Sequence, residues 1–326
     1  MAVRFQESYA PIVLQCAMRC SAMMEEPMRR RLIALLSLIF CGCGPAGEGR
    51  LKAIIGAMLI DGAGGPPVSN SVVLVAGDHI RAAGSHSDIP IPEDADKIDG
   101  AGNFLVPALV DICDRADPPG MLRPSSPADA RSRVSELSAN KAAAIHIGKL
   151  PAQVAEAVLE AARDAHIPVT GHVSTLAEVK FLVDKGASAL VGMIRDTEDL
   201  DPVLLGKLRD LRIVVAPALV SAGDKLEISQ RNTRRLFSAG VLLGLASEGG
   251  DPLHEAELMA DAGVPPPDVI VATTRNGAMA LRQLDDRGTI EAEKRADLVM
   301  VSANPAEDIR NLRKVALRMA GGAFSR

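Results

Sequence analysis

Short apolar segments alternate with longer helical segments through the middle of the chain, and this alternation constrains the fold more than any other feature. Residues 142–148, 167–173 and 188–193 are apolar and strand-like, and a stretch with helical periodicity follows each of them. Strands of a parallel sheet are buried on both faces, and helices connect them. The sequence therefore predicts an α/β fold with a parallel sheet or barrel over residues 107–287.

Strand patterns with Gly and Pro turns occupy both sides of this region. Residues 51–104 contain short strand-like runs separated by turns, and the pattern returns in residues 289–324. We therefore expect a small β-sandwich domain built from residues 50–106 and 288–326, which brackets the barrel region.

The barrel region is too short for a complete (β/α)8 barrel. Residues 105–281 number fewer than the roughly 200–250 that such barrels need, and the interval from Asp111 to His146 has room for about one βα unit of roughly 30 residues. We therefore expect a shortened TIM-like barrel that lacks about two strands. Its open edges are either covered by residues 116–139 or form the interface of a homo-oligomer.

Charge and cysteine distribution argue against nucleic-acid binding and against a disulfide-stabilised fold. The formal net charge of -5 comes from well-mixed basic and acidic residues without a basic stripe, so no nucleic-acid binding is expected. Four of the five cysteines lie within the first 43 residues, so Cys113 stands alone in the body of the chain and no disulfide framework is expected.

Residues 28–49 have the features of an export signal. Three arginines precede a largely apolar run of nine residues, which is too short to span a bilayer. Residues 40–43 resemble a bacterial lipoprotein signal, which makes Cys43 the expected lipidation site and the only membrane attachment. We expect a location in the bacterial cell envelope; the alternatives are signal cleavage without lipidation, and a cytoplasmic protein with a non-functional leader. Residues 1–27 are interpreted as a spurious upstream extension.

Four segments, in the correct order, resemble the imidazolonepropionase-like and prolidase-like branch of the amidohydrolase superfamily. They are residues 51–84, 101–111, 142–193 and 272–309. The resemblance implies a (β/α) barrel bracketed by a small β-domain. It also implies hydrolysis of non-peptide C–N bonds with one or two divalent metals, which lower the pKa of the attacking water.

The family's metal ligands can be located on this sequence one by one. The His-x-His pair of the first strand corresponds to Cys113 and Arg115, and the bridging carboxylated Lys corresponds to His146. The next His is retained as His172, whereas the following one corresponds to Gly192. Arginine and glycine cannot bind a metal, so the resemblance implies that the two-metal site is lost.

The catalytic Asp of the family corresponds to Glu248, and two interpretations of the altered site follow. In the first, the charge of Arg115 replaces that of a metal, and its guanidinium pairs with Glu248 and with Asp111 on the same strand face.

In the second interpretation, a single zinc ion is bound by four side chains of acceptable type, namely Cys113, His146, His172 and Glu248. His254 follows Glu248 closely and is a candidate for lining the mouth of the barrel, or else a helix-surface residue. Cys113 also remains a candidate nucleophile with a histidine as its base, although a buried cysteine commonly serves packing alone.

The resemblance therefore predicts an amidohydrolase-family protein with a degraded metal site, weakly active or inactive and without a cofactor. One alternative is a mononuclear zinc hydrolase of amide, cyclic imide or lactone bonds, in which Glu248 acts as the base. The other alternative is a module that binds a small-molecule ligand, or assembles, through the relic barrel.

Overall fold

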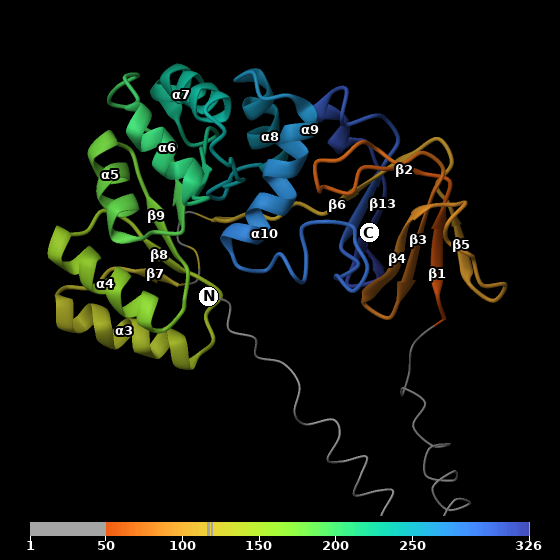
Figure 1. Ribbon diagram of the computed structural model, residues 1–326, viewed down its shortest axis with the longest axis horizontal. Coiled ribbons are helices and arrows are strands. Elements are labelled where there is room, and N and C mark those ends of the chain that lie inside the picture. Colours follow the sequence, from red (N-terminus) through yellow and green to blue (C-terminus); the bar gives the residue numbers. More distant parts are fainter. Residues whose placement is uncertain (1–49, 116–117, 119, 326) are drawn as a thin grey trace, which may run out of the picture. The chain divides into compact units, whose positions relative to one another are not determined.

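The computed structural model describes residues 50–115, 118 and 120–325 (Figure 1). Residues 1–27 and the predicted leader with Cys43 lie outside the described residues, so the leader and its lipidation stay predictions. Within the described part of the chain, no helix is both long enough and apolar enough to cross a membrane.

The barrel region contains a five-stranded parallel sheet. The order of its strands is β11-β10-β9-β8-β7, and every neighbouring pair is parallel. The strands are Met121–Leu122 (β7), Ile145–Ile147 (β8), Val169–His172 (β9), Ala189–Val191 (β10) and Val214–Ala216 (β11). Strands that follow one another in the chain are neighbours in the sheet, which is the connectivity of successive βα units. The predicted α/β class is confirmed.

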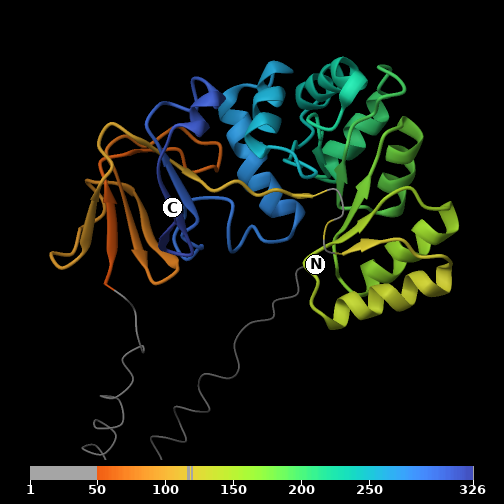
Figure 2. The ribbon, with the colours of Figure 1, turned by 180° about the vertical axis from the view of Figure 1, so that it is seen from behind.

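Helices follow the strands in chain order, and α4, α5 and α6 lie along one face of the sheet (Figures 1 and 2). The α-helices are Pro127–Ala139 (α3), Ala152–Asp164 (α4), Leu176–Lys185 (α5), Pro202–Asp210 (α6), Leu226–Ser238 (α7), Pro252–Asp261 (α8), Pro266–Val271 (α9) and Gly277–Ala280 (α10). The shorter helical turns are Gly223–Lys225 (η1), Ala272–Asn276 (η2) and Ile309–Arg313 (η3). A capping box formed by Thr175 and Glu178 begins α5, because each side chain accepts a hydrogen bond from the backbone amide of the other residue.

Two further segments extend the sheet beyond β11. Val215 forms a parallel bridge with Leu243, and Leu245 forms one with Asp111. The described residues thus provide a ladder of five strands and two bridged segments, fewer than the eight strands of a complete barrel. The predicted shortened barrel is confirmed, and the number of missing strands stays a prediction. The single βα unit predicted between Asp111 and His146 consists of β7 and α3. Among the described residues no ladder joins β7 to the Asp111 segment, so the sheet is open there.

Both ends of the described chain build two small sheets, with strand orders β4-β3-β1-β5 and β14-β13-β12-β6-β2. Their strands are Lys52–Ile55 (β1), Met58–Leu59 (β2), Ser71–Ala76 (β3), His79–Ser85 (β4), Asp96–Asp99 (β5), Phe104–Pro107 (β6), Leu298–Val301 (β12), Val315–Ala320 (β13) and Ala323–Ser325 (β14). Ile54, Leu105 and Leu298 share one buried apolar cluster, so the two sheets pack as a sandwich. Gly49–Arg326 forms one compact unit, and the domain boundaries near residues 107 and 287 stay predictions.

Candidate metal centre

Neighbouring parallel strands bring His146 and His172 together. Ile145 and Ile147 of β8 belong to the apolar core beneath the helices. Because side chains alternate along a strand, His146 between them points to the opposite face, into the barrel. His172 ends the adjacent strand β9, and the centroids of the two imidazole rings are 5.8 Å apart.

Cys113 approaches the two histidines from the segment that follows β6. The amide of Ile112 donates to the carbonyl of Leu245, which holds this segment beside the last strand position of the sheet. The Sγ atom of Cys113 lies 4.0 Å from Nε2 of His172, and the thiol donates to the carbonyl of Arg115 at 3.1 Å. Cys113 is only 1% exposed, so its sulfur is an interior atom.

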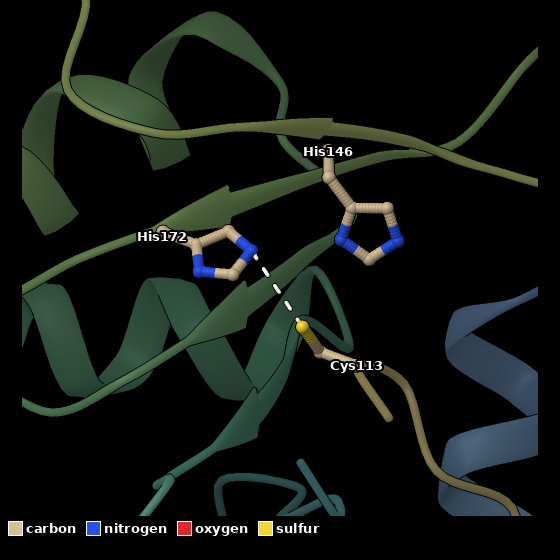
Figure 3. Close-up of side chains that lie close together, drawn as sticks. All are labelled: Cys113, His146 and His172. Carbon is tan, nitrogen blue, oxygen red and sulfur yellow. Dashed lines mark hydrogen bonds between the residues drawn. The ribbon is translucent and has the colours of Figure 1, made fainter. Parts of the chain in front are cut away.

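The three side chains converge on one point (Figure 3). One ligand atom from each of Cys113, His146 and His172 lies within 4.8 Å of the other two. His146 is 4% exposed, and its Nδ1 atom is buried without a hydrogen-bond partner. A buried polar atom normally has a hydrogen-bond partner. This nitrogen is one of several buried side-chain atoms without a partner among the described residues, and it is the one that lies in the cluster.

Burial shifts the pKa values of Cys113 and His146 in opposite directions. It raises the pKa of the Cys113 thiol to about 12, and the negative charge of Glu248 adds to this shift. Burial also lowers the pKa of His146 to about 4, and the neighbouring His172 contributes to the decrease. At neutral pH the cluster therefore holds a protonated thiol and a neutral imidazole with a free lone pair.

Glu248 lies behind His172 and not among the converging ligand atoms. Its Oε1 atom is 3.2 Å from Nδ1 of His172, and its Oε2 atom accepts a hydrogen bond of 2.6 Å from the Ser221 hydroxyl. The hydrogen bond from His172 lowers the pKa of Glu248. Glu248 has a positive φ of 47°, and its amide donates to the Cys113 carbonyl at 2.8 Å. The expectation of Glu248 as a fourth metal ligand is corrected, since this carboxylate orients His172 instead.

The predicted pairing of Arg115 with Glu248 and Asp111 was wrong. Arg115 donates to its neighbour Asp114 at 3.0 Å, and its side chain is 58% exposed. Asp111 instead accepts hydrogen bonds from the Ser247 hydroxyl at 2.5 Å and from the Cys113 amide at 3.0 Å. Burial raises the pKa of Asp111 despite these bonds. Asp111 is the last residue of this segment that bridges to the sheet, so the alternation that was expected to direct Arg115 inward no longer applies.

Gly192 and His254 do not contribute ligands. Gly192 has a φ of 100°, and a Cβ atom at this position would lie 2.2 Å from the carbonyl oxygen of Val173. No side chain fits there without a shift of the backbone. His254 lies in the first turn of α8 with Nδ1 3.3 Å from Glu257, and its side chain is 51% exposed.

Three residues that the sequence did not single out support the site. They are Ser247, which holds Asp111, Ser221, which holds Glu248, and the fully buried Glu255 of α8. The serines gave no sequence signal, because isolated serines are common in loops. A Glu among the apolar residues of an amphipathic helix was the only detectable sign of Glu255.

A cavity of about 240 Å³ lies beside His172, between the ends of β8 and β9 and the helices α4 and α5. Its lining is largely apolar and includes Leu150, Ala177 and Phe181. Cavities at this edge of a parallel sheet are the usual ligand sites of α/β folds. The cavity is therefore the candidate entrance for a small substrate.

The profile of the amidohydrolase family matches residues 138–323 of the chain. No curated protein matches the sequence significantly. Among solved structures, a protein from Bifidobacterium longum assigned as a prolidase has 19% identity and a TM-score of 0.72, with 86% of this chain and 95% of that chain covered. Phenylurea hydrolase B has 18% identity and a TM-score of 0.72, with 84% and 96% covered. Ochratoxinase from A. niger has 14% identity and a TM-score of 0.73, with 85% and 96% covered. At these identities the similarity shows a common fold.

Proposed function

The chain belongs to the amidohydrolase family, and we propose that it is a hydrolase that uses one divalent metal ion instead of two. The proposed substrates are small compounds with an amide, cyclic imide or lactone bond. The observation that carries this proposal is the convergence of the ligand atoms of Cys113, His146 and His172 within 4.8 Å.

The chemistry of this donor set fits zinc. A thiolate and two imidazoles are ligands that zinc prefers, and three protein ligands leave a fourth position open, as in catalytic zinc sites. The unpartnered Nδ1 of His146 supplies a buried lone pair that a cation would satisfy. A bound zinc ion polarises a carbonyl group and lowers the pKa of water.

The chain's own residues prepare the site for this chemistry. Glu248 faces Nδ1 of His172 and therefore favours the proton on that nitrogen, which leaves the lone pair of Nε2 directed at the cluster. The largely apolar lining of the adjoining cavity suits the apolar part of a substrate. Substrates with a small apolar group beside the scissile bond are expected to bind best.

The test uses the full-length chain. After loading with zinc and desalting, the protein is expected to hold about one zinc ion per chain. A chelator is expected to abolish its hydrolysis of a panel of N-acyl amino acids, cyclic imides and lactones, and zinc is expected to restore it. A chain that retains no zinc would contradict the proposal.

Zinc affinity is expected to depend on pH with a defined slope. The Cys113 thiol has a pKa of about 12 and must lose its proton to bind zinc. Each pH unit should therefore raise the affinity about tenfold from about pH 7.5 to about pH 9.5, a range in which imidazoles are already neutral. Competition with a chromophoric chelator measures the slope. In the Cys113→His variant the slope should fall towards zero, and a wild-type slope that flattens below about pH 9 would argue against a strongly raised thiol pKa.

A second candidate function is a zinc site that supports the fold without turnover. The burial of Cys113 and His146, and the engagement of both carboxylate oxygens of Glu248, favour it. In this case the same experiment would find bound zinc, a chelator-sensitive melting temperature and no hydrolysis of any compound in the panel.

A further inference from the structure

Glu255 is a carboxylate buried without an ion-pair partner among the described residues. It is 0% exposed, and its two oxygens accept hydrogen bonds from the amides of Leu219 at 2.9 Å and Val220 at 2.8 Å. Burial of a carboxylate is costly unless its hydrogen bonds are satisfied. The loop that follows β11 satisfies both oxygens, so Glu255 and this loop are held together.

The residue that follows Val220 reaches the candidate metal centre. The Ser221 hydroxyl lies 2.6 Å from Oε2 of Glu248 and 3.0 Å from the carbonyl oxygen of Ala218, so its one proton is donated over the shorter contact, to Glu248. The Oε1 atom of Glu248 is 3.2 Å from Nδ1 of His172. A Cβ atom on Gly250 would lie 2.6 Å from a methyl group of Val220, so the loop that follows Glu248 packs closely against the loop that carries Ser221. A continuous set of contacts therefore leads from Glu255 to the imidazole of His172.

The helix that carries Glu255 is anchored on its other side. Arg313 of η3 forms ion pairs with Asp251 at 2.7 Å and with Glu257 at 2.6 Å, and Arg310 pairs with Asp261 at 2.7 Å. These contacts span the length of α8. Glu255 thus projects from a fixed helix, and a fixed support is what precise placement of a ligand requires.

We propose that Glu255 and Ser221 are positioning residues for His172. They hold Glu248 where its carboxylate keeps the proton of His172 on Nδ1, and so they direct the lone pair of Nε2 towards Cys113. The hydrogen bond at one imidazole nitrogen sets which nitrogen carries the proton. The expected effect on zinc affinity rests on the proposed function. The expected position of the proton on His172 does not depend on it.

Nitrogen-15 NMR of the metal-free, full-length chain at alkaline pH, where imidazoles are neutral, reports the position of this proton. The wild type is expected to show the Nδ1–H form of His172 alone. Ser221→Ala and Glu255→Gln should both introduce the Nε2–H form, whereas Ser221→Thr, which keeps the hydroxyl group, should not. Glu257→Gln is the matched control, because it makes the same change on the same helix at a residue that contacts Arg313.

Zinc affinity provides the second readout. Loss of a residue that supports a ligand typically lowers metal affinity about 10- to 100-fold, and this decrease is expected for Ser221→Ala and Glu255→Gln but not for Glu257→Gln. Ser221 is exposed, so its alanine variant is informative even if Glu255→Gln does not fold. An unchanged His172 tautomer in Ser221→Ala would overturn the inference. A tautomer change in a chain that never binds zinc would support the positioning role and contradict the proposed function.

Discussion

Replacing His172 with alanine is expected to lower zinc affinity by more than about 100-fold, because loss of a ligand should exceed the effect of losing a residue that only supports one. His172 is the residue on which the cluster depends. Its Nε2 faces Cys113, its Nδ1 faces Glu248, and its ring borders the neighbouring cavity. Without it, Cys113 and His146 remain as two ligands, too few for a stable mononuclear site.

The measurement is a competition titration with metal analysis of the desalted protein, together with circular dichroism to show that the variant folds. His254→Ala is the control, because His254 is exposed and pairs with Glu257 on α8. It should bind zinc as the wild type does. If His172→Ala retained about one zinc ion per chain, any zinc bound by this protein would have to lie elsewhere.

The residue types of the site were predictable from the sequence, but their contacts were only partly so. Cys113, His146 and His172 lie on or directly beside strands of the parallel sheet, where alternation and the family pattern together indicate which side chains point inward. Arg115 lies two residues beyond Cys113, after the chain has left the sheet, and there the rule fails. The direction of the Arg115 side chain is then set by the nearest opposite charge, and Arg115 pairs with Asp114.

The supporting residues could not be predicted, because their contacts join distant parts of the chain. Ser221 and Glu248 are 27 positions apart, and Leu219 and Glu255 are 36 apart. Neither spacing follows a helical or strand period. Only the folded chain brings the loop after β11 beneath α8 and beside Glu248.

The alternation of strand-like and helical segments predicted the fold class, but not the length or pairing of every strand. Leu243 and Leu245 join the sheet only through isolated bridges, and β7 has only two residues. A two-residue strand has no detectable period, so the sequence indicated only that one βα unit lies between Asp111 and His146 and could not locate β7 within it. The openness of the sheet between β7 and the Asp111 segment was nevertheless predictable from chain length.

Returning a histidine to position 192 is expected to destabilise the protein and not to rebuild a two-metal centre. Gly192 has a φ of 100°, which side chains with a Cβ atom rarely adopt, and that Cβ atom would meet the carbonyl oxygen of Val173 at 2.2 Å. This oxygen belongs to the backbone, and the amide of Val173 is itself tied to Val191 by a hydrogen bond of 2.8 Å. Relief of the clash therefore requires movement of two neighbouring parallel strands.

We expect a cost of about 3 kcal/mol or more for Gly192→His, which corresponds to a decrease in Tm of about 5 °C or more. Differential scanning calorimetry and metal analysis measure the two effects. Gly206→Ala is the matched control: Gly206 lies within α6 with no atom within 4 Å of its added Cβ, so this change should raise stability by about 0.5–1 kcal/mol. A Gly192→His variant that has the Tm of the wild type and binds two metal ions would show that the backbone can adjust to the added side chain. If the variant is destabilised and binds no second metal ion, the backbone at position 192 excludes a ligand side chain, and no single substitution there creates a second metal site.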